Sequence, residues 1–114
     1  DVLLMPYPAT CETAGWMSPL KLFEYMAAGR AIVATDLPAI RMHLEHGRNA
    51  HLVPSGDAAG MAGAIRCIIS KGAYAHRLGQ AARSDVALYT WHNRARAVLA
   101  RFGSPSEADE RAFA

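Results

Sequence analysis

Three short apolar runs, separated by helix-like segments, constrain the fold of this chain more than any other feature. Residues 2–5 and 31–35 are unbroken runs, and residues 49–53 form a third, weaker run closed by Pro54. Such runs are typical of strands that are buried on both faces of a parallel sheet. The order strand, helix, strand, helix, strand, followed by further helices, predicts half of a doubly wound α/β fold in a single domain.

The segments between and after these runs carry helix start and stop signals. Asp36 is expected to cap a short helix that is entered through Pro38 and ends at Gly47. Asp57 is expected to cap a longer helix that runs to about Gly72. The apolar residues expected to face inward on these and the following helix are Ile40 and Leu44, then Met61, Ile65, Ile68 and Ile69, then Tyr74, Leu78, Ala82 and Val86.

The C-terminal third predicts two more helices and a tail. Gly79 lies inside the first of these helices and is expected to weaken it. The second is clearly amphipathic, with arginines on one side and an apolar stripe on the other, expected to pack in the core or to dock against a domain outside this chain. The stripe consists of Trp91, Ala95, Val98, Leu99 and Phe102. Residues 104–114 are predicted to form a flexible tail.

Composition narrows the classes of function. A net charge of +2 from scattered charges is too weak to indicate nucleic acid or a membrane surface as partner. Cys11 and Cys67 have neither CxxC nor zinc-like spacing, which predicts reduced thiols and a cytoplasmic setting. The histidines have no metal-ligand spacing with a carboxylate partner, and the sequence contains no GxSxG or P-loop motif. No apolar run is long enough to span a bilayer.

The stretch from Ser18 to Gly29 has the pattern of a buried helix that carries two charges in unfavourable places. Ser18 is a good N-cap, Pro19 suits the first helical position, and Gly29 suits the stop. Nearly every other residue is apolar, so the helix is expected to be buried on more than one face. Lys21 lies in the first turn, where the helix dipole disfavours a cation, and Glu24 falls on a face that should belong to the core.

Two interpretations of these charges remain open. Both placements are explained if the helix start faces a bound anion and Glu24 contacts polar groups of the same ligand. The loop over residues 6–17 leads into this helix from the carboxyl end of the first strand, where α/β sheets bind ligands. The alternative is an exposed ion pair between Lys21 and Glu24, three residues apart on one helix.

A long ordered series of motifs runs through the chain. It consists of Pro6-Tyr7-Pro8, residues 18–29, residues 31–38, residues 49–54 and Gly56-Asp57. Together these motifs resemble the C-terminal, donor-binding domain of retaining GT-B glycosyltransferases of family 4. The resemblance implies a Rossmann-like parallel sheet with flanking helices, which is half of a GT-B fold. Residues 1–103 would then be an N-terminally incomplete nucleotide-sugar-binding domain, and the abrupt start on a strand predicts a fragment of a longer protein.

The same resemblance implies a donor site at the start of the helix. Glu24 would hold the ribose hydroxyls of a nucleotide-diphosphate sugar, and the backbone amides of Leu20 and Lys21 would hold the diphosphate. The Ser18 hydroxyl and the Lys21 ammonium are further candidates for phosphate contact, and Pro19 completes the donor-binding segment. No catalytic residue is assigned, and no metal or other cofactor is expected.

One position departs from the family pattern. Trp16 stands where the family usually has a second Glu, eight residues before the ribose-binding one, that contacts the donor sugar. Glu12 and Thr13 lie out of register with that position, so the sugar contact is assigned to neither.

The implied function is sugar transfer from a nucleotide-diphosphate donor to an acceptor hydroxyl with retention of configuration. One alternative is a non-catalytic nucleotide-sugar-binding module, which Trp16 favours. Another is a GT-B-like nucleotide-sugar epimerase, for which Glu12 is the one spare carboxylate. The expected partners are the donor and an N-terminal acceptor domain of the same protein, and the resemblance allows peripheral membrane association of the full-length enzyme. Nucleic acid is not expected.

Overall fold

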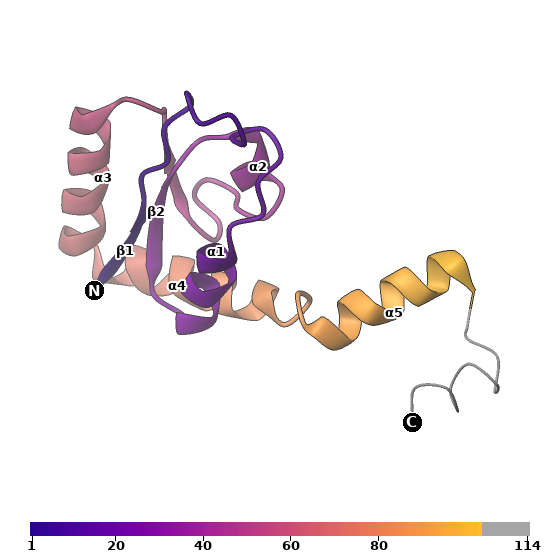
Figure 1. Ribbon diagram of the computed structural model, residues 1–114. Helices are drawn as coiled ribbons and strands as arrows, with labels where there is room; N and C mark the ends of the chain where they lie inside the picture. The colour runs from indigo at the N-terminus through magenta and orange to yellow at the C-terminus, as the bar shows by residue number, and fades with distance from the viewer. Residues whose placement is uncertain (104–114) are drawn as a thin grey trace.

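The computed structural model describes residues 1–103 and consists there of a three-stranded parallel sheet and five helices (Figure 1). In chain order the elements are β1 (Val2–Met5), α1 (Leu20–Ala28), β2 (Ala31–Thr35), α2 (Pro38–Arg41), β3 (His51–Val53), α3 (Ala58–Ser70), α4 (Gly72–Val86) and α5 (Trp91–Phe102). The predicted α/β class, the parallel sheet and the flanking helices are confirmed. The predicted tail, residues 104–114, lies outside the described residues.

β2 is the central strand, and both of its faces are covered. The sheet order is β1-β2-β3, with Val33 of β2 paired with both Leu4 and His51. All five residues of β2 are buried. Ile32 and Ala34 belong to the core cluster formed with α1 and α2, whereas Ala31 and Val33 belong to the cluster formed with α3. The unbroken apolar run is therefore explained by burial on both faces.

The helices divide between the two faces of the sheet. Figure 1 shows α3 on one side and α1 and α2 on the other. α4 crosses the end of the sheet where the strands begin, and it contributes Leu78 to one core cluster and Ala82 to the other. This arrangement leaves the opposite end, where the strands finish, to the connecting loops.

α5 extends away from the sheet (Figure 1). It has no buried residue, and the side chains of Trp91 and Phe102 are 80% and 81% exposed. The prediction that the apolar stripe packs in the core of this domain is therefore wrong within residues 1–103. None of the helices in this part of the chain is long and apolar enough to cross a membrane.

Several helix boundaries differ from the predictions for local reasons. Asp57 caps α3 as expected, accepting a hydrogen bond from the amide of Gly60 at 2.7 Å. Asp36 does not cap α2, because its carboxylate pairs with Arg41 and the N-cap is Leu37. α2 ends at Arg41 and not at 47, because the chain turns there into a loop that the buried side chain of Asn49 holds by hydrogen bonds.

The inward face of α3 also differs in one residue. Ile68 is buried as predicted, but Ile69 is 71% exposed. Ala64, one turn before Ile68, occupies the inward position instead, with only 3% of its surface exposed. The small side chain of Ala64 on the inward face lets α3 pack close to the sheet.

Gly79 serves close packing between α4 and the chain entering β2. A Cβ atom at this position would lie 2.4 Å from the carbonyl oxygen of Gly29 and 3.2 Å from the carbonyl carbon of Arg30. Gly29 ends α1 in the left-handed region, with φ of 65°, as its position in the sequence predicts. The lack of a side chain on Gly79 thus sets how near α4 approaches the sheet.

We expect Gly79→Ala to destabilise the fold by about 1–3 kcal/mol, because the clash with backbone outweighs the gain in helix propensity. Gly63→Ala on α3 is the matched control, since a Cβ there meets nothing within 4 Å. The control should be neutral or stabilising by up to about 1 kcal/mol. Urea unfolding of both variants measures the difference, and equal effects would contradict the close-packing role of Gly79.

Candidate functional site

The loops that follow the three strands converge at the carboxyl edge of the sheet. The Thr35 hydroxyl donates to the carbonyl of Met5 at 3.2 Å, which joins the ends of β2 and β1. The amide of Asp36 donates to the carbonyl of Val53 at 2.7 Å, which joins the ends of β2 and β3. Ligands of open α/β sheets bind outside this edge.

The loop between β1 and α1 is built from consecutive tight turns. The amide of Ala14 donates to the carbonyl of Cys11 at 2.9 Å, and the amide of Met17 donates to the carbonyl of Thr13 at 2.7 Å. Ala14 is buried and anchors the loop to the core formed with α1. The amide of Ala9 donates to the Ser55 hydroxyl at 2.8 Å, which ties the loop to the turn after β3.

The start of α1 has no side-chain cap. Pro19 is the N-cap, with φ of −70° and ψ of 116°, and the first bond runs from the amide of Leu22 to its carbonyl at 3.0 Å. The predictions that Ser18 caps the helix and that Pro19 takes the first helical position are wrong by one residue, because Pro19 itself is in the extended conformation. With no acidic residue in the first turn either, the positive end of the helix dipole meets no counter-charge from its own helix.

α1 is buried along one side only. Leu22 and Met26 are fully buried, whereas Leu20 is 67% exposed and Lys21 and Glu24 are exposed as well. The prediction that Glu24 lies on a core face is therefore wrong. Leu20, Ala27 and Ala28 lie beside Glu24 on the same exposed side, so α1 presents an outward face that carries apolar side chains and two charges.

Within residues 1–103, Lys21 and Glu24 form no ion pair with each other or with another charged side chain. The ion pairs within residues 1–103 are Arg41–Asp36, Arg48–Glu45 and Arg48–Asp85. The alternative interpretation, an ion pair between Lys21 and Glu24, is thus not supported. The predicted donor-binding residues, Ser18, Pro19, Leu20, Lys21 and Glu24, lie together at the entry and first turns of α1.

A cluster of aromatic rings, which the sequence did not predict, joins α1 to the segments after α2 and α4. The rings of Phe23 on α1, His43 after α2 and Tyr89 after α4 lie with their centroids 5.0–5.1 Å apart. The Nδ1 atom of His43 is buried with no hydrogen-bond partner in the described part of the chain. Burial lowers the pKa of His43, so the neutral ring is favoured in this cluster.

A buried polar network holds the adjacent loop. Asn49 is fully buried; its side-chain oxygen accepts from the amide of Glu45 at 2.7 Å. Its side-chain nitrogen donates to the carbonyl of His43 at 3.1 Å and to the carboxylate of Asp85 at 2.8 Å. Asp85 also pairs with Arg48 at 2.7 Å, and the Arg48 guanidinium and the Asn49 amide hold the pKa of Asp85 below its usual range. The network joins residues far apart in sequence, so no periodic pattern predicts it.

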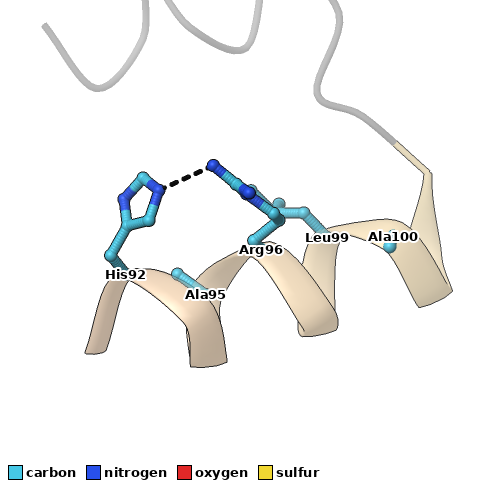
Figure 2. A pocket seen from close by; sticks show the side chains of 5 residues that line it. All are labelled: His92, Ala95, Arg96, Leu99 and Ala100. Carbon is cyan, nitrogen blue, oxygen red and sulfur yellow. Dashed lines mark hydrogen bonds between the residues drawn. The ribbon is translucent and has the colours of Figure 1, made fainter. Parts of the chain in front are cut away.

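Two surface pockets of the described chain do not include the first turn of α1. One lies beside the ring cluster and the Asn49 network, with His43, Arg48, Asp85 and Tyr89 among its lining residues. The other is formed by a single face of α5 and is lined by His92, Ala95, Arg96, Leu99 and Ala100, with Nη2 of Arg96 2.9 Å from Nε2 of His92 (Figure 2). It lies far from the carboxyl edge of the sheet (Figure 1). No group of three or more His, Cys, Asp or Glu side chains among residues 1–103 could hold a metal ion. The start of α1 remains the best candidate site, as an open surface.

Solved structures show where this fold occurs. The chain superposes on sucrose-phosphate synthase from Thermosynechococcus elongatus with a TM-score of 0.65 and 30% identity, over 74% of this chain and 22% of that one. It superposes on the Anabaena protein HepE, solved in complex with UDP-glucose, with a TM-score of 0.74 and 19% identity, over 90% of this chain and 28% of that one. The fold is thus part of a GT-B structure.

Sequence comparison gives the family. Residues 1–71 match the family described as Glycosyl transferases group 1, and the chain belongs to this family. It is 40% identical over 70 residues to phosphatidyl-myo-inositol mannosyltransferase from Mycobacterium leprae and 44% identical over 72 residues to that from Mycolicibacterium smegmatis. Each match covers 61% of this chain, and the chain covers 19% and 18% of those two relatives, about a fifth of their length.

Ser55→Ala tests whether the turn after β3 holds the loop after β1. Loss of the bond to the Ala9 amide should make hydrogen exchange of that amide about fivefold faster, as expected for a bond worth about 1 kcal/mol. Ser84→Ala on the exposed side of α4 is the control and should leave Ala9 unchanged. Equal exchange rates at Ala9 in the two variants would show that the loop is held by its own turns alone.

Proposed function

We propose that this chain is the donor-binding domain of a retaining glycosyltransferase, which transfers a sugar from a nucleotide-diphosphate sugar to an acceptor hydroxyl. The observation that carries the proposal is the exposed, uncapped start of α1, where Lys21 and Glu24 form no ion pair with any other residue of the described chain. Membership of the Glycosyl transferases group 1 family supports it.

The diphosphate would bind at the first turn of α1. Backbone amides at a helix start lack intrahelical partners, and those of Leu20 and Lys21 would donate to phosphate oxygens. The Ser18 hydroxyl and the Lys21 ammonium would add further donors, while Pro19 keeps the chain extended just before the helix. No acidic side chain in the first turn opposes this charge.

Glu24 would hold the ribose. It lies three residues beyond Lys21, about 4.5 Å along the helix axis, so the two side chains can reach adjacent parts of one nucleotide. A carboxylate accepts hydrogen bonds from two hydroxyls at once, which suits the 2′ and 3′ positions of a ribose. An exposed carboxylate beside exposed apolar side chains is well suited to bind a ligand that is both polar and flat.

The chemical contribution of this domain would be electrostatic. As the sugar leaves, charge builds on the departing diphosphate, and the helix amides and Lys21 are arranged to stabilise it. These groups would take the role that a divalent cation has in other transferases. No side chain here is assigned as a nucleophile.

A second domain would complete the enzyme. The relatives are about five times longer than the matched region, and both α1 and α5 expose apolar side chains in the described structure. We propose that an acceptor-binding domain covers these surfaces and that the chain alone binds donor weakly without transferring sugar. The names of the relatives favour a phosphatidylinositol-type lipid as the acceptor, and hence an enzyme that acts at a membrane surface. The proposed setting, cytoplasmic, rests on the two free cysteines.

Trp16 favours a second candidate function. It is 75% exposed in the loop before α1, at the position where the family pattern has a sugar-binding Glu. A module that binds the nucleotide portion without transferring the sugar would not need that carboxylate.

Nucleotide titration tests the site. Addition of UDP, GDP and ADP to the chain should shift the amide resonances of residues 18–24 with at least one of the three. Glu24→Gln should weaken that binding about tenfold, because a hydrogen bond to a charged group contributes about 1.5–3 kcal/mol. Glu12→Gln, which changes an exposed carboxylate in the preceding loop, is the control and should bind as the wild type does.

The dideoxy form of the same nucleotide identifies which part of the ligand Glu24 contacts. Without the 2′ and 3′ hydroxyls, wild type and Glu24→Gln should bind equally. A tenfold difference that persists with the dideoxy nucleotide would show that Glu24 does not hold the ribose. Unchanged spectra with all three nucleotides would count against the donor site itself.

A further inference from the structure

The outer edge of β3 is capped by a histidine side chain. β3 is an edge strand of the described sheet, and the amide of Leu52 points outward and donates to Nδ1 of His46 at 3.0 Å. Nδ1 can accept this bond only while it carries no proton, so the bond requires the neutral ring with its proton on Nε2. Protonation at Nδ1 and the bond to Leu52 exclude each other.

A second histidine lies against the first. The rings of His46 and His51 meet edge to face, with centroids 4.7 Å apart and an interplanar angle of 76°. Nδ1 of His51 is 3.2 Å from the hydroxyl of Tyr74 on α4. Two protonated imidazoles at this distance repel, so the pair is compatible with the neutral state.

The charged groups around the pair do not favour protonation. From α4, the Arg77 guanidinium lies 5.3 Å from the centre of the Tyr74 ring and donates to the carbonyl of Gly47 at 2.9 Å. The pKa of Tyr74 is raised, mainly by burial and to a smaller extent by the thiol of Cys67 on α3.

The one carboxylate beside the pair in sequence is engaged elsewhere. Glu45 binds Arg48 at 2.8 Å, and none of the ion pairs within residues 1–103 includes His46 or His51. Burial and the neighbouring His46 lower the pKa of His51 from 6.5.

We propose that the His46–His51 pair is an acid-released clamp on β3: the neutral pair caps the outer edge of the strand, and protonation of His46 at Nδ1 frees it. β3 continues directly into the turn that holds Ser55, which binds the amide of Ala9 in the loop before α1. Release of the clamp loosens that turn, so a fall in pH also weakens the hold of Ser55 on the loop before α1. The clamp does not depend on the proposed function, since no ligand takes part.

The direction of the pH effect follows from the neutral pair in the folded state. The bond from the Leu52 amide needs an unprotonated Nδ1 on His46, and the pKa of His51 is lowered in the folded chain. Stability that depends on a group with a lowered folded pKa is present above its unfolded pKa, about 6.5 for histidine, and is lost as the pH falls below it, so acid weakens the closed clamp.

Hydrogen exchange of the Leu52 amide tests the clamp. Between pH 7.5 and pH 5.5, after correction for intrinsic exchange, its protection should fall about fivefold, as expected for loss of one hydrogen bond. The amide of Gly29, at the end of α1, is the internal reference and should keep its protection. Equal losses at both amides would mean that acid lowers global stability only, and would overturn the proposal.

Two variants of His46 separate its role as hydrogen-bond acceptor from its protonation. His46→Asn places a side-chain oxygen near the Nδ1 position, so it should keep the Leu52 amide protected at both pH values. His46→Phe has no acceptor and should leave that amide unprotected at both. A pH-dependent loss in His46→Asn equal to that of wild type would contradict the clamp.

The tautomer of His46 provides a measurement that needs no variant. Imidazole nitrogen-15 shifts of the wild-type chain should show unprotonated Nδ1 at pH 7.5 and protonated Nδ1 at pH 5.5. A proton on Nδ1 at pH 7.5 would overturn the proposal even if the variants failed to fold.

Discussion

The burial of β2 on both faces is the constraint on which the rest of this structure depends. Its side chains alternate between two core clusters, one shared with α1 and α2 and one with α3. Gly79 lets α4 close one end of the sheet against the backbone at Gly29. Because that end is closed by a helix, the opposite end, where the strands finish, is left to loops and to function.

Those loops are joined by polar contacts that reach across the sheet. Thr35, Asp36 and Ser55 connect the ends of the three strands, so the candidate site is held by several elements at once. The start of α1 combines an uncapped helix end with exposed lysine and glutamate side chains. A surface that leaves these groups unpaired in the described chain is suited to an anionic ligand with hydroxyl groups.

The strands and the capping of α3 were predictable because their signals are local: an unbroken apolar run and an aspartate before a helix. The burial of Glu24 was predicted wrongly, because small apolar residues such as Ala27 and Ala28 mark a core only when something covers them, and here they are exposed. The Asn49 network and the ring cluster around His43 were not predictable, since they join side chains from distant segments. The exposed apolar face of α1 that misled the prediction is one of the observations behind the proposed second domain.

A crystal structure of the chain with a bound nucleoside diphosphate would show whether the start of α1 holds a nucleotide by its diphosphate and ribose. We expect phosphate oxygens within hydrogen-bond distance of the Leu20 and Lys21 amides, and ribose hydroxyls on the carboxylate of Glu24. A nucleotide bound instead on α5, or one whose ribose points away from α1, would contradict the proposed donor site.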